Sequence, residues 1–343
     1  MSSQKLLINK NLQSEEVVSP RQRTFEFKIA RYQHTMRLDK YLTTTLPSEI
    51  TRNQIQKLIK SGKILVDAKP GKVSQLIEPG QIITVDYELP YDPTLYSENI
   101  PLDVVYEDNY LLVINKPPGL IVHPGAGNAT GTLVNALLYH CEYLSNENGP
   151  YRPGIVHRLD KETSGLLVAA KDNSVHSSLR KQFTNRKIDK RYLALVWGVM
   201  KQPSGDINLP IGRSLKDRKK FAVVPDGRES LTRYEVVEQF EFLTLLRLKL
   251  ETGRTHQIRV HLSHLNHPVF GDPYYGGRNT KMITLNLRNR LLAAKLLSVM
   301  KRQALHAQSL SFTHPISGAI VSCEAPLHDD YLEILGLLRE QNA

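Results

Sequence analysis

The chain has 343 residues, enough for two or three domains of ordinary size. Its 45 lysines and arginines against 34 acidic residues give a formal net charge of +11, which favours a polyanionic partner, with nucleic acid ahead of an anionic membrane. No apolar run approaches the ~18 residues that span a bilayer, and the first twenty residues contain no apolar core of a secretory signal.

The N-terminal part of the chain predicts a flexible lead over residues 1–23 and a small α/β domain over residues 24–92. Thr51 stands where a helix N-cap is expected, and Gly62 would end the same helix. The expected elements are a half-buried strand at 24–29, a helix around 38–42, a helix at 52–61, and strands at 64–66 and 81–87.

Positive charge is concentrated on one part of this small domain. Between positions 52 and 72 there are six basic residues and one acid, Asp67. A charge run is often only a solvated face, but this concentration favours RNA binding. The candidate RNA contacts on the predicted helix are Arg52, Lys57 and Lys60.

The residue order here resembles the small helix-helix-strand RNA-binding domain named after a ribosomal protein of the small subunit. Three stretches carry the resemblance: 37–42, 51–67 and the closing turn at 78–81. The resemblance implies that this domain contacts RNA.

A linker is predicted over residues 93–100, followed by a larger domain at 101–343. Strands succeed one another there with helices interspersed, rather than in strict alternation, which predicts an α+β fold with a mixed, mostly antiparallel sheet. The expected strands are 104–106, 111–115, 165–170, 191–199, 230–237, 243–251, 305–312 and 319–323. The expected helices are 132–139, 174–183, one that Thr255 would cap, 285–304, and one that begins at Asp329.

The densest candidate for a functional site is the stretch 154–165, which has a glycine at each end. Five ionisable side chains lie there within six residues, between two apolar segments. Active sites are commonly placed at such junctions between a strand and a loop, although an exposed charged turn would have the same composition. The five side chains are His157, Arg158, Asp160, Lys161 and Glu162.

With these residues in view, the chain resembles the RluA family of RNA pseudouridine synthases, and its RluD branch most closely. The resemblance runs in order along almost the whole chain. The motifs that carry it are 115–119, 123–127, 157–165, 190–194, 252–261, 267–268, 271–273 and 303–307.

The resemblance implies that Asp160 is the catalytic residue of a reaction without a cofactor. The uridine N-glycosidic bond is cleaved, the uracil rotates, and it is rejoined to the ribose through carbon. A carboxylate suits this chemistry because it can form a covalent adduct, and an unperturbed Asp with a pKa of about 3.9 is already ionised at pH 7. The sequence leaves open whether Asp160 attacks ribose C1′ or uracil C6.

Other site roles also come from the resemblance. Tyr192 is expected to stack on the uracil, and Arg259 to pair with the aspartate, with Arg254 as the open alternative. Because the target base must leave its stack in the RNA, Arg158 is expected to fill the vacated place. His157 either contacts RNA or only orders its loop.

Three rival interpretations are weaker. His123, Gly125 and Gly127 lack the Gly-Lys-Ser/Thr of a phosphate-binding loop. An aspartyl-phosphate enzyme would need membrane spans that the sequence does not contain. A zinc site lacks nearby cysteines or acids and is not implied by the family, so we expect neither metal nor cofactor. The residues that prompt the zinc reading are His256, His261, His264 and His267.

The expected partner is ribosomal RNA of the large subunit or its precursor, bound by a monomer with no membrane contact. The same chemistry on tRNA, or a non-catalytic role in ribosome assembly, is the alternative. The two cysteines, Cys141 and Cys323, form no disulfide framework, so we expect a cytoplasmic protein, with an organellar location left open. The helical run 282–301 is interpreted as an insertion without an assigned role.

Overall fold

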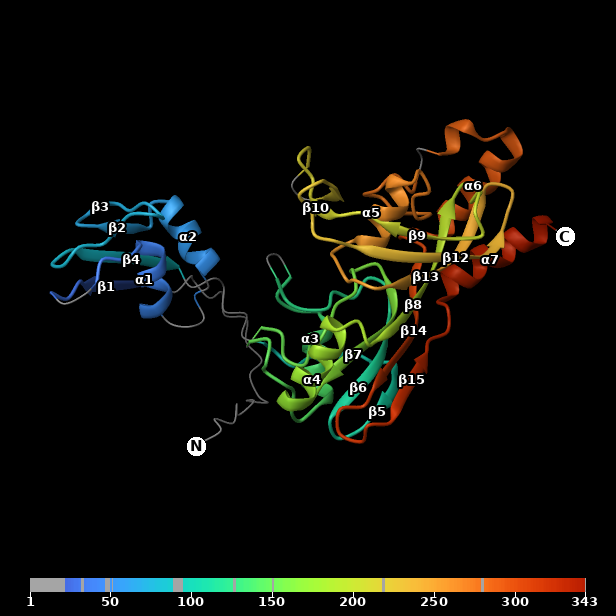
Figure 1. Ribbon diagram of the computed structural model, residues 1–343. Coiled ribbons are helices and arrows are strands. Elements are labelled where there is room, and N and C mark those ends of the chain that lie inside the picture. The colour runs from blue at the N-terminus through green and yellow to red at the C-terminus, as the bar shows by residue number, and fades with distance from the viewer. Residues whose placement is uncertain are drawn as a thin grey trace. The chain divides into compact units, whose positions relative to one another are not determined.

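The computed structural model describes residues 22–31, 34–46, 50, 52–88, 95–125, 128–149, 151–217, 220–278 and 281–342. The chain divides into two compact units, Met1–Thr94 and Leu95–Ala343, each with its own core (Figure 1). Thr51, Gly127 and residues 1–21 of the expected lead lie outside the described residues.

The N-terminal unit contains a four-stranded antiparallel sheet in the order β1-β4-β2-β3 and two helices. The helices bury their apolar stripes on the sheet, so that Leu38, Ile55 and Ile64 share one core. The elements are β1 (Gln22–Lys28), α1 (Leu38–Thr45), α2 (Arg52–Lys60), β2 (Ile64–Val66), β3 (Lys69–Pro70) and β4 (Ile82–Glu88).

One buried charge organises the helices of this unit. Asp39 on α1 is fully buried and accepts hydrogen bonds from Arg52 Nη2 at 2.8 Å, Gln56 Nε2 at 3.1 Å and Arg37 Nε at 3.0 Å. Burial acts to raise the pKa of Asp39, but these three donors outweigh it and lower the pKa to about 2. Arg52 is therefore committed to a structural ion pair, while Lys57 and Lys60 of the same helix are exposed.

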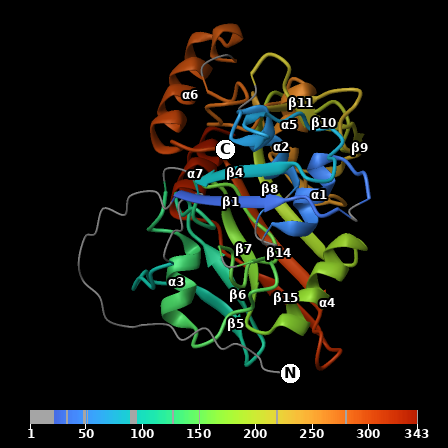
Figure 2. The same cartoon turned by 90° about the vertical axis from the view of Figure 1, so that its left-hand side faces the viewer.

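The C-terminal unit is built on a mixed sheet that has nine strands in the described part of the chain. The strand order is β5-β6-β7-β14-β8-β13-β12-β9, with β15 paired to β14. All pairs are antiparallel except β7 with β14, so the expectation of an α+β fold with a mostly antiparallel sheet is confirmed. Figure 2 shows β7, β14 and β8 running through the middle of this unit. The strands are β5 (Val104–Glu107), β6 (Leu111–Lys116), β7 (Ser164–Ala170), β8 (Asp189–Trp197), β9 (Ser204–Asn208), β12 (Leu231–Gln239), β13 (Leu243–Leu250), β14 (Leu305–Thr313) and β15 (Ile320–Glu324).

Helices cover both faces of this sheet. Successive side chains of a strand point to opposite sides, so the strands contribute apolar side chains to a core on each face. On one face Leu112 and Tyr192 share a core with Ile258 of α5 and with α3. On the other face Leu193 and Trp197 pack with α6 and α7, and β7 packs with α4. Tyr192 and α5 therefore lie on the same side of the sheet. The helices are α3 (Leu133–His140), α4 (Asn173–Thr184), α5 (Gln257–His264), α6 (Leu287–Val299) and α7 (Asp329–Asn342).

Several sequence expectations need correction. Thr255 does not cap α5: the N-cap residue is His256, with a left-handed φ of 57°, and no side chain makes the cap hydrogen bond. The expected helix at 285–304 is shorter, with a 3₁₀ turn (Met282–Thr284) before α6. The expectations also missed β9 and the hairpin of β10 (Ile211–Arg213) and β11 (Phe221–Val223). Among the described residues, none of the helices has the length and apolarity needed to cross a membrane.

The parallel pair β7–β14 depends on a close backbone approach at Gly165. This residue has φ of 106°, and a Cβ there would lie 2.2 Å from the carbonyl oxygen of Ala307. Only glycine fits both the conformation and the space. The pair fixes where the chain leaves the candidate site stretch and enters the sheet.

We expect Gly165→Ala to lower the free energy of unfolding of the C-terminal unit by about 2–4 kcal/mol, because the methyl group would overlap the backbone of Ala307. Denaturant unfolding followed by the fluorescence of Trp197, the chain's one tryptophan, measures this unit. The matched control is Gly336→Ala in α7, where a Cβ meets nothing within 4 Å. This control should be neutral or stabilising by up to about 1 kcal/mol; equal losses in both variants would contradict the argument.

Candidate active site

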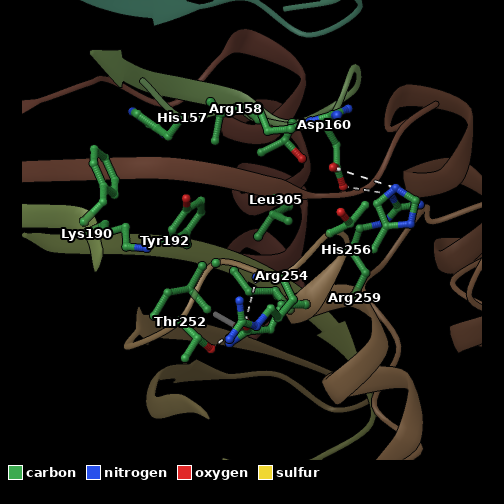
Figure 3. Close-up of a pocket in the computed structure, with 18 of the residues that line it drawn as sticks. His157, Arg158, Asp160, Lys190, Tyr192, Thr252, Arg254, His256, Arg259 and Leu305 are labelled. Carbon is green, nitrogen blue, oxygen red and sulfur yellow. Dashed lines mark hydrogen bonds and ion pairs between the residues drawn. The ribbon is translucent and has the colours of Figure 1, made fainter. Parts of the chain in front are cut away.

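The candidate site is a pocket of about 410 Å³ on the face of the sheet that carries α5 (Figure 3). Its walls come from segments far apart in the sequence: the loop before β7, the end of α4, strand β8, the loop after β13, the first turn of α5 and the start of β14. The sequence-predicted residues that line it are His157, Arg158, Asp160, Tyr192, Arg254 and Arg259.

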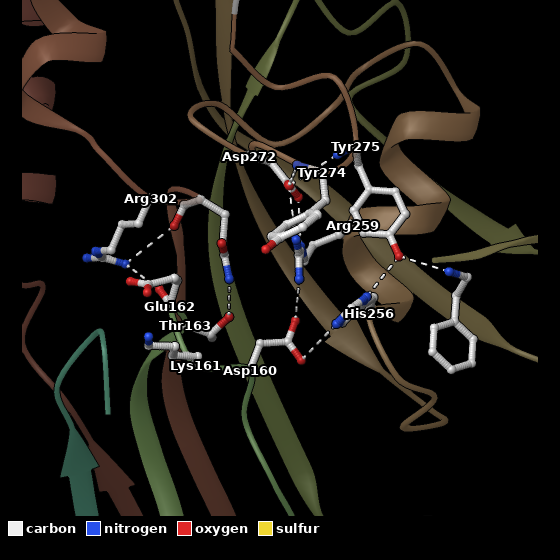
Figure 4. A network of polar contacts seen from close by, with 12 residues as sticks. Asp160, Lys161, Glu162, Thr163, His256, Arg259, Asp272, Tyr274, Tyr275 and Arg302 are labelled. Atoms are coloured by element: carbon white, nitrogen blue, oxygen red, sulfur yellow. Dashed lines mark hydrogen bonds and ion pairs between the residues drawn. The ribbon is translucent and has the colours of Figure 1, made fainter. Parts of the chain in front are cut away.

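A buried arginine shared by two carboxylates lies at the centre of the site (Figure 4). Arg259 Nη1 donates to Asp160 Oδ2 at 2.9 Å. Its Nε and Nη2 donate to the two oxygens of Asp272 at 2.7 and 3.0 Å. The Asp272 side chain is 0% exposed and that of Asp160 is 18% exposed, so Asp160 is the carboxylate that faces the pocket.

Arg259 stays positively charged because two carboxylates, Asp160 and Asp272, pair with it. Burial acts to lower the pKa of Arg259, but the hydrogen bonds and charge of Asp272, followed by those of Asp160, outweigh it and raise the pKa above its ordinary value. Asp272 also accepts the backbone N–H groups of Tyr274 and Tyr275 at 2.9 and 3.2 Å. Arg259 is therefore always charged, and Asp272 fixes its position. From that position Arg259 orients the Asp160 carboxylate.

Two arginines were candidates to pair with Asp160, and the structure separates them. Arg259 makes the ion pair. Arg254 donates through Nε to the carbonyl oxygen of Glu229 at 3.2 Å, and its backbone N–H donates to Gln257 Oε1 at 3.0 Å. Arg254 therefore forms a wall of the pocket without touching the aspartate.

Tyr192 projects from β8 into the same pocket and is 7% exposed. Burial, and then the nearby charge of Asp160, raise the pKa of its phenol. The side chain is therefore a neutral hydroxyl with a flat apolar ring. Ile258 and Leu305 add apolar surface, so the pocket has a carboxylate on one wall and a stacking surface on another.

His157 lies in the wall but is turned toward the protein. Its Nε2 accepts the backbone N–H of Val168 at 3.1 Å, and its ring lies 4.7 Å from that of Phe183. Burial, with a smaller effect of Lys190, lowers the pKa of His157 to about 3, so the ring is neutral at pH 7. Of the two expected roles, this geometry matches the ordering of the loop. Arg158, one residue further on, is exposed at the pocket.

Lys116 supports the turn that carries Asp160 through hydrogen bonds to backbone carbonyl oxygens. This side chain is fully buried, and Nζ donates to the carbonyl oxygens of Pro117, Leu120 and Lys161 at 2.7, 3.0 and 3.0 Å. Burial lowers the pKa of Lys116 to about 7, although Glu162 nearby opposes this shift. The motif 115–119 is therefore a support for the aspartate turn.

A second support comes from the segment just before β14 and from α7. Arg302 Nη1 donates to the carbonyl oxygen of Glu162 at 3.2 Å, while its Nε and Nη2 each donate to Asp330 of α7 at 2.7 Å. Gln303 Nε2 donates to Thr163 Oγ1 at 3.2 Å. Figure 4 shows Arg302 beside Glu162, on the side of the turn away from Arg259.

Three residues that matter in this geometry had no assigned role at the sequence level: Asp272, His256 and Tyr275. His256 Nε2 lies 3.8 Å from Asp160 Oδ1, and its Nδ1 lies 2.8 Å from the hydroxyl of Tyr275. Asp272 and His256 both fall inside the motifs that carried the family resemblance, which was the available signal. Of the histidines of the zinc reading, His256, His261 and His267 have hydrogen-bond partners in the protein, and no group of three or more metal-ligating side chains occurs in the described part of the chain.

Comparison with known proteins bears on both units. The family of RNA pseudouridylate synthases matches residues 110–264, and the S4 domain family matches residues 36–83. The chain is 43% identical to the RNA pseudouridine synthase YlyB of Bacillus subtilis, over 90% of this chain and 96% of that one. It is 42% identical to the ribosomal large subunit pseudouridine synthase D of Xanthomonas campestris, over 90% of each chain.

Solved structures agree with the fold of the C-terminal unit. The human RNA pseudouridylate synthase domain containing 4 is 25% identical, with a TM-score of 0.53, and covers 69% of this chain and 92% of its own. The human RNA pseudouridylate synthase domain containing 1 is 27% identical, with a TM-score of 0.51, and covers 67% of this chain and 85% of its own. Taken with the sequence matches, these likenesses place the chain in the RluA family of RNA pseudouridine synthases, with an N-terminal S4 RNA-binding domain.

Proposed function

We propose that this RNA pseudouridine synthase modifies uridines of large-subunit ribosomal RNA, with Asp160 as the nucleophile. The proposed chemistry is supported by one observation: the Asp160 carboxylate faces the pocket and pairs with Arg259, which in turn pairs with the buried Asp272. The relatives named as ribosomal large subunit enzymes support the substrate. Modification of tRNA by the same site is the alternative.

The reaction needs no group beyond the chain and the RNA. The Asp160 carboxylate adds to ribose C1′ or uracil C6, and the bond between C1′ and uracil N1 breaks. The uracil turns within the pocket and C5 bonds to C1′; this step displaces the Asp160 carboxylate if it was attached to C1′, whereas an adduct at C6 breaks afterwards. C5 then loses its proton and N1 takes up a proton. Substrate and product are isomers, so atoms and electrons balance without a cofactor.

The remaining pocket residues fit the other demands of this chemistry. Tyr192 offers a flat ring on which the extruded uracil can stack, and its protonated hydroxyl can take part in proton transfer at C5. Arg158 is exposed at the pocket, where its guanidinium can replace the extruded base in the RNA stack.

Replacing Asp160 by asparagine keeps the shape of the side chain and removes its negative charge. We expect pseudouridine formation on unmodified large-subunit rRNA to fall by at least about 10³-fold, because the adduct cannot form. Carbodiimide-dependent reverse-transcription stops, read with EDTA present, map the modified uridines. If the Asp160→Asn variant produced stops at the wild-type rate, Asp160 would not be the nucleophile. If the wild-type chain produced stops only on tRNA, the substrate would be tRNA and not rRNA.

Replacing Asp272 by asparagine tests whether Asp272 positions the Asp160 carboxylate by holding Arg259 in place. Loss of its charge frees the guanidinium to shift, so we expect kcat to fall by about 10- to 100-fold with little change in KM. Single-turnover and steady-state rates on the same rRNA separate the two constants. Glu333→Gln, which removes one negative charge from an exposed position of α7, is the control. A change in KM alone would contradict the positioning role.

For the S4 domain we propose that Lys57 and Lys60 contact phosphates of the RNA. Changing both to glutamine should weaken RNA affinity and lower the slope of log Kd against log salt by about 1.5 to 2, while kcat at saturating RNA stays unchanged. Filter binding at several salt concentrations measures the slope.

Arg52→Gln is the informative contrast in the same helix. Because Arg52 neutralises the buried Asp39, this change should reduce the stability of the N-terminal unit by about 1–3 kcal/mol and leave the salt slope nearly as it was. A slope unchanged in the double lysine variant would contradict the proposed phosphate contacts.

A further inference from the structure

His256 lies between the candidate nucleophile and a basic hairpin at the edge of the pocket. Its ring contacts the rings of Phe221 and Tyr275 edge-on, with centroids 5.8 and 5.6 Å away. Nε2 points toward Asp160 Oδ1 at 3.8 Å, as Figure 4 shows. His256 thus faces the oxygen of Asp160 that Arg259 does not hold.

The hydrogen bonds around His256 decide where its proton lies. The Tyr275 oxygen already accepts the backbone N–H of Phe221 at 3.1 Å, and burial raises the pKa of this phenol, so the hydroxyl keeps its proton. This hydroxyl can donate its proton to Nδ1 of His256, 2.8 Å away. Burial lowers the pKa of His256, which favours the neutral ring. In the tautomer that accepts the Tyr275 hydroxyl at Nδ1, the ring proton lies on Nε2, facing Asp160.

We propose that His256 is a second positioning residue for Asp160, and that it couples the β10–β11 hairpin to the nucleophile. Once the gap closes, Nε2–H would hold Oδ1 while Arg259 holds Oδ2, which would fix the carboxylate in two directions. This inference rests on the proposed function of Asp160. The distance of 3.8 Å is longer than a hydrogen bond, and such contacts often shorten only when substrate is bound.

The hairpin supplies a physical reason for this tightening. The Arg213 guanidinium lies 4.6 Å from the centre of the Phe221 ring, and Phe221 in turn touches His256. Arg213 and Lys216 are exposed on the hairpin and have the charge to meet RNA phosphates. RNA seated on these cations would press Phe221 against His256 and close the gap to Asp160, so the nucleophile becomes fully positioned only when RNA is in place.

The left-handed backbone of His256 is consistent with this role. A φ of 57° is uncommon for residues other than glycine, and histidine is one of the few, with asparagine and aspartate, that adopt it more often. It directs the ring out of the start of α5 and toward the pocket, where an ordinary capping residue would have turned to the helix backbone.

The test compares two substitutions of nearly equal shape. His256→Gln retains an N–H donor at the end of the side chain, and His256→Met does not; both bear the same cost of the left-handed backbone. We expect the single-turnover rate on rRNA to fall about 10- to 100-fold in the methionine variant and to recover most of that loss in the glutamine variant. RNA affinity should stay within about twofold of wild type in both.

A purely structural His256 would give a different result: equal rates for the two variants, together with equal losses of stability by Trp197 fluorescence. Equal rates would overturn the positioning role, provided that the wild-type chain is active in the same assay. If the wild-type chain makes no pseudouridine on rRNA or tRNA, the proposed function fails first.

The coupling to the hairpin needs a double-mutant cycle. Phe221→Leu should reduce the single-turnover rate in the wild-type background and have little further effect when His256 is already methionine, because both changes remove the same contact. Additive losses would overturn the coupling and leave His256 as an independent positioning residue.

Discussion

The burial of Arg259 is the constraint on which the candidate site depends. A guanidinium that is only 4% exposed requires a counterion that is always present, since an unpaired buried charge is strongly destabilising. Asp272, fully buried and held by two backbone N–H groups, meets this requirement through two oxygens. The third donor nitrogen of Arg259 is then available for Asp160, so the proposed nucleophile is held without being the counterion that the fold needs.

The sheet determines where these groups meet. Asp160 and Arg259 are 99 positions apart, and they come together because β7 leaves the aspartate turn beside β14, next to β8 and β13. Gly165 permits that parallel pairing, and Lys116 and Arg302 hold the turn through carbonyl oxygens. Backbone carbonyls are fixed by the main chain, so this support does not depend on which side chains occupy the turn.

Much of this was predictable from the sequence, and the omissions have a common cause. The α+β class, the S4-type domain and the family followed from alternation, helical spacing and collinear motifs. Motifs do not show which partner each side chain chooses in space. Arg52 has the charge of an RNA contact but pairs with a buried acid, and His157 lies in the site stretch but bonds to a strand. Thr255 is a residue type that often caps helices, yet the N-cap of α5 is the left-handed His256, whose Nε2 lies 3.8 Å from Asp160 Oδ1.

The site therefore has a buried half, whose side-chain positions are fixed when the chain folds, and an exposed half, whose side chains can contact RNA. Arg259, Asp272 and Lys116 are fixed by several partners each and keep their geometry without substrate. Arg158, Arg213 and Lys216 are exposed, and their contacts to RNA would add to those of the S4 domain. Extrusion of a base costs a few kcal/mol, and only interactions with the RNA itself can offset it. Because the buried half needs no further ordering, the binding energy of the exposed cations is left for extruding the base and closing the pocket around it.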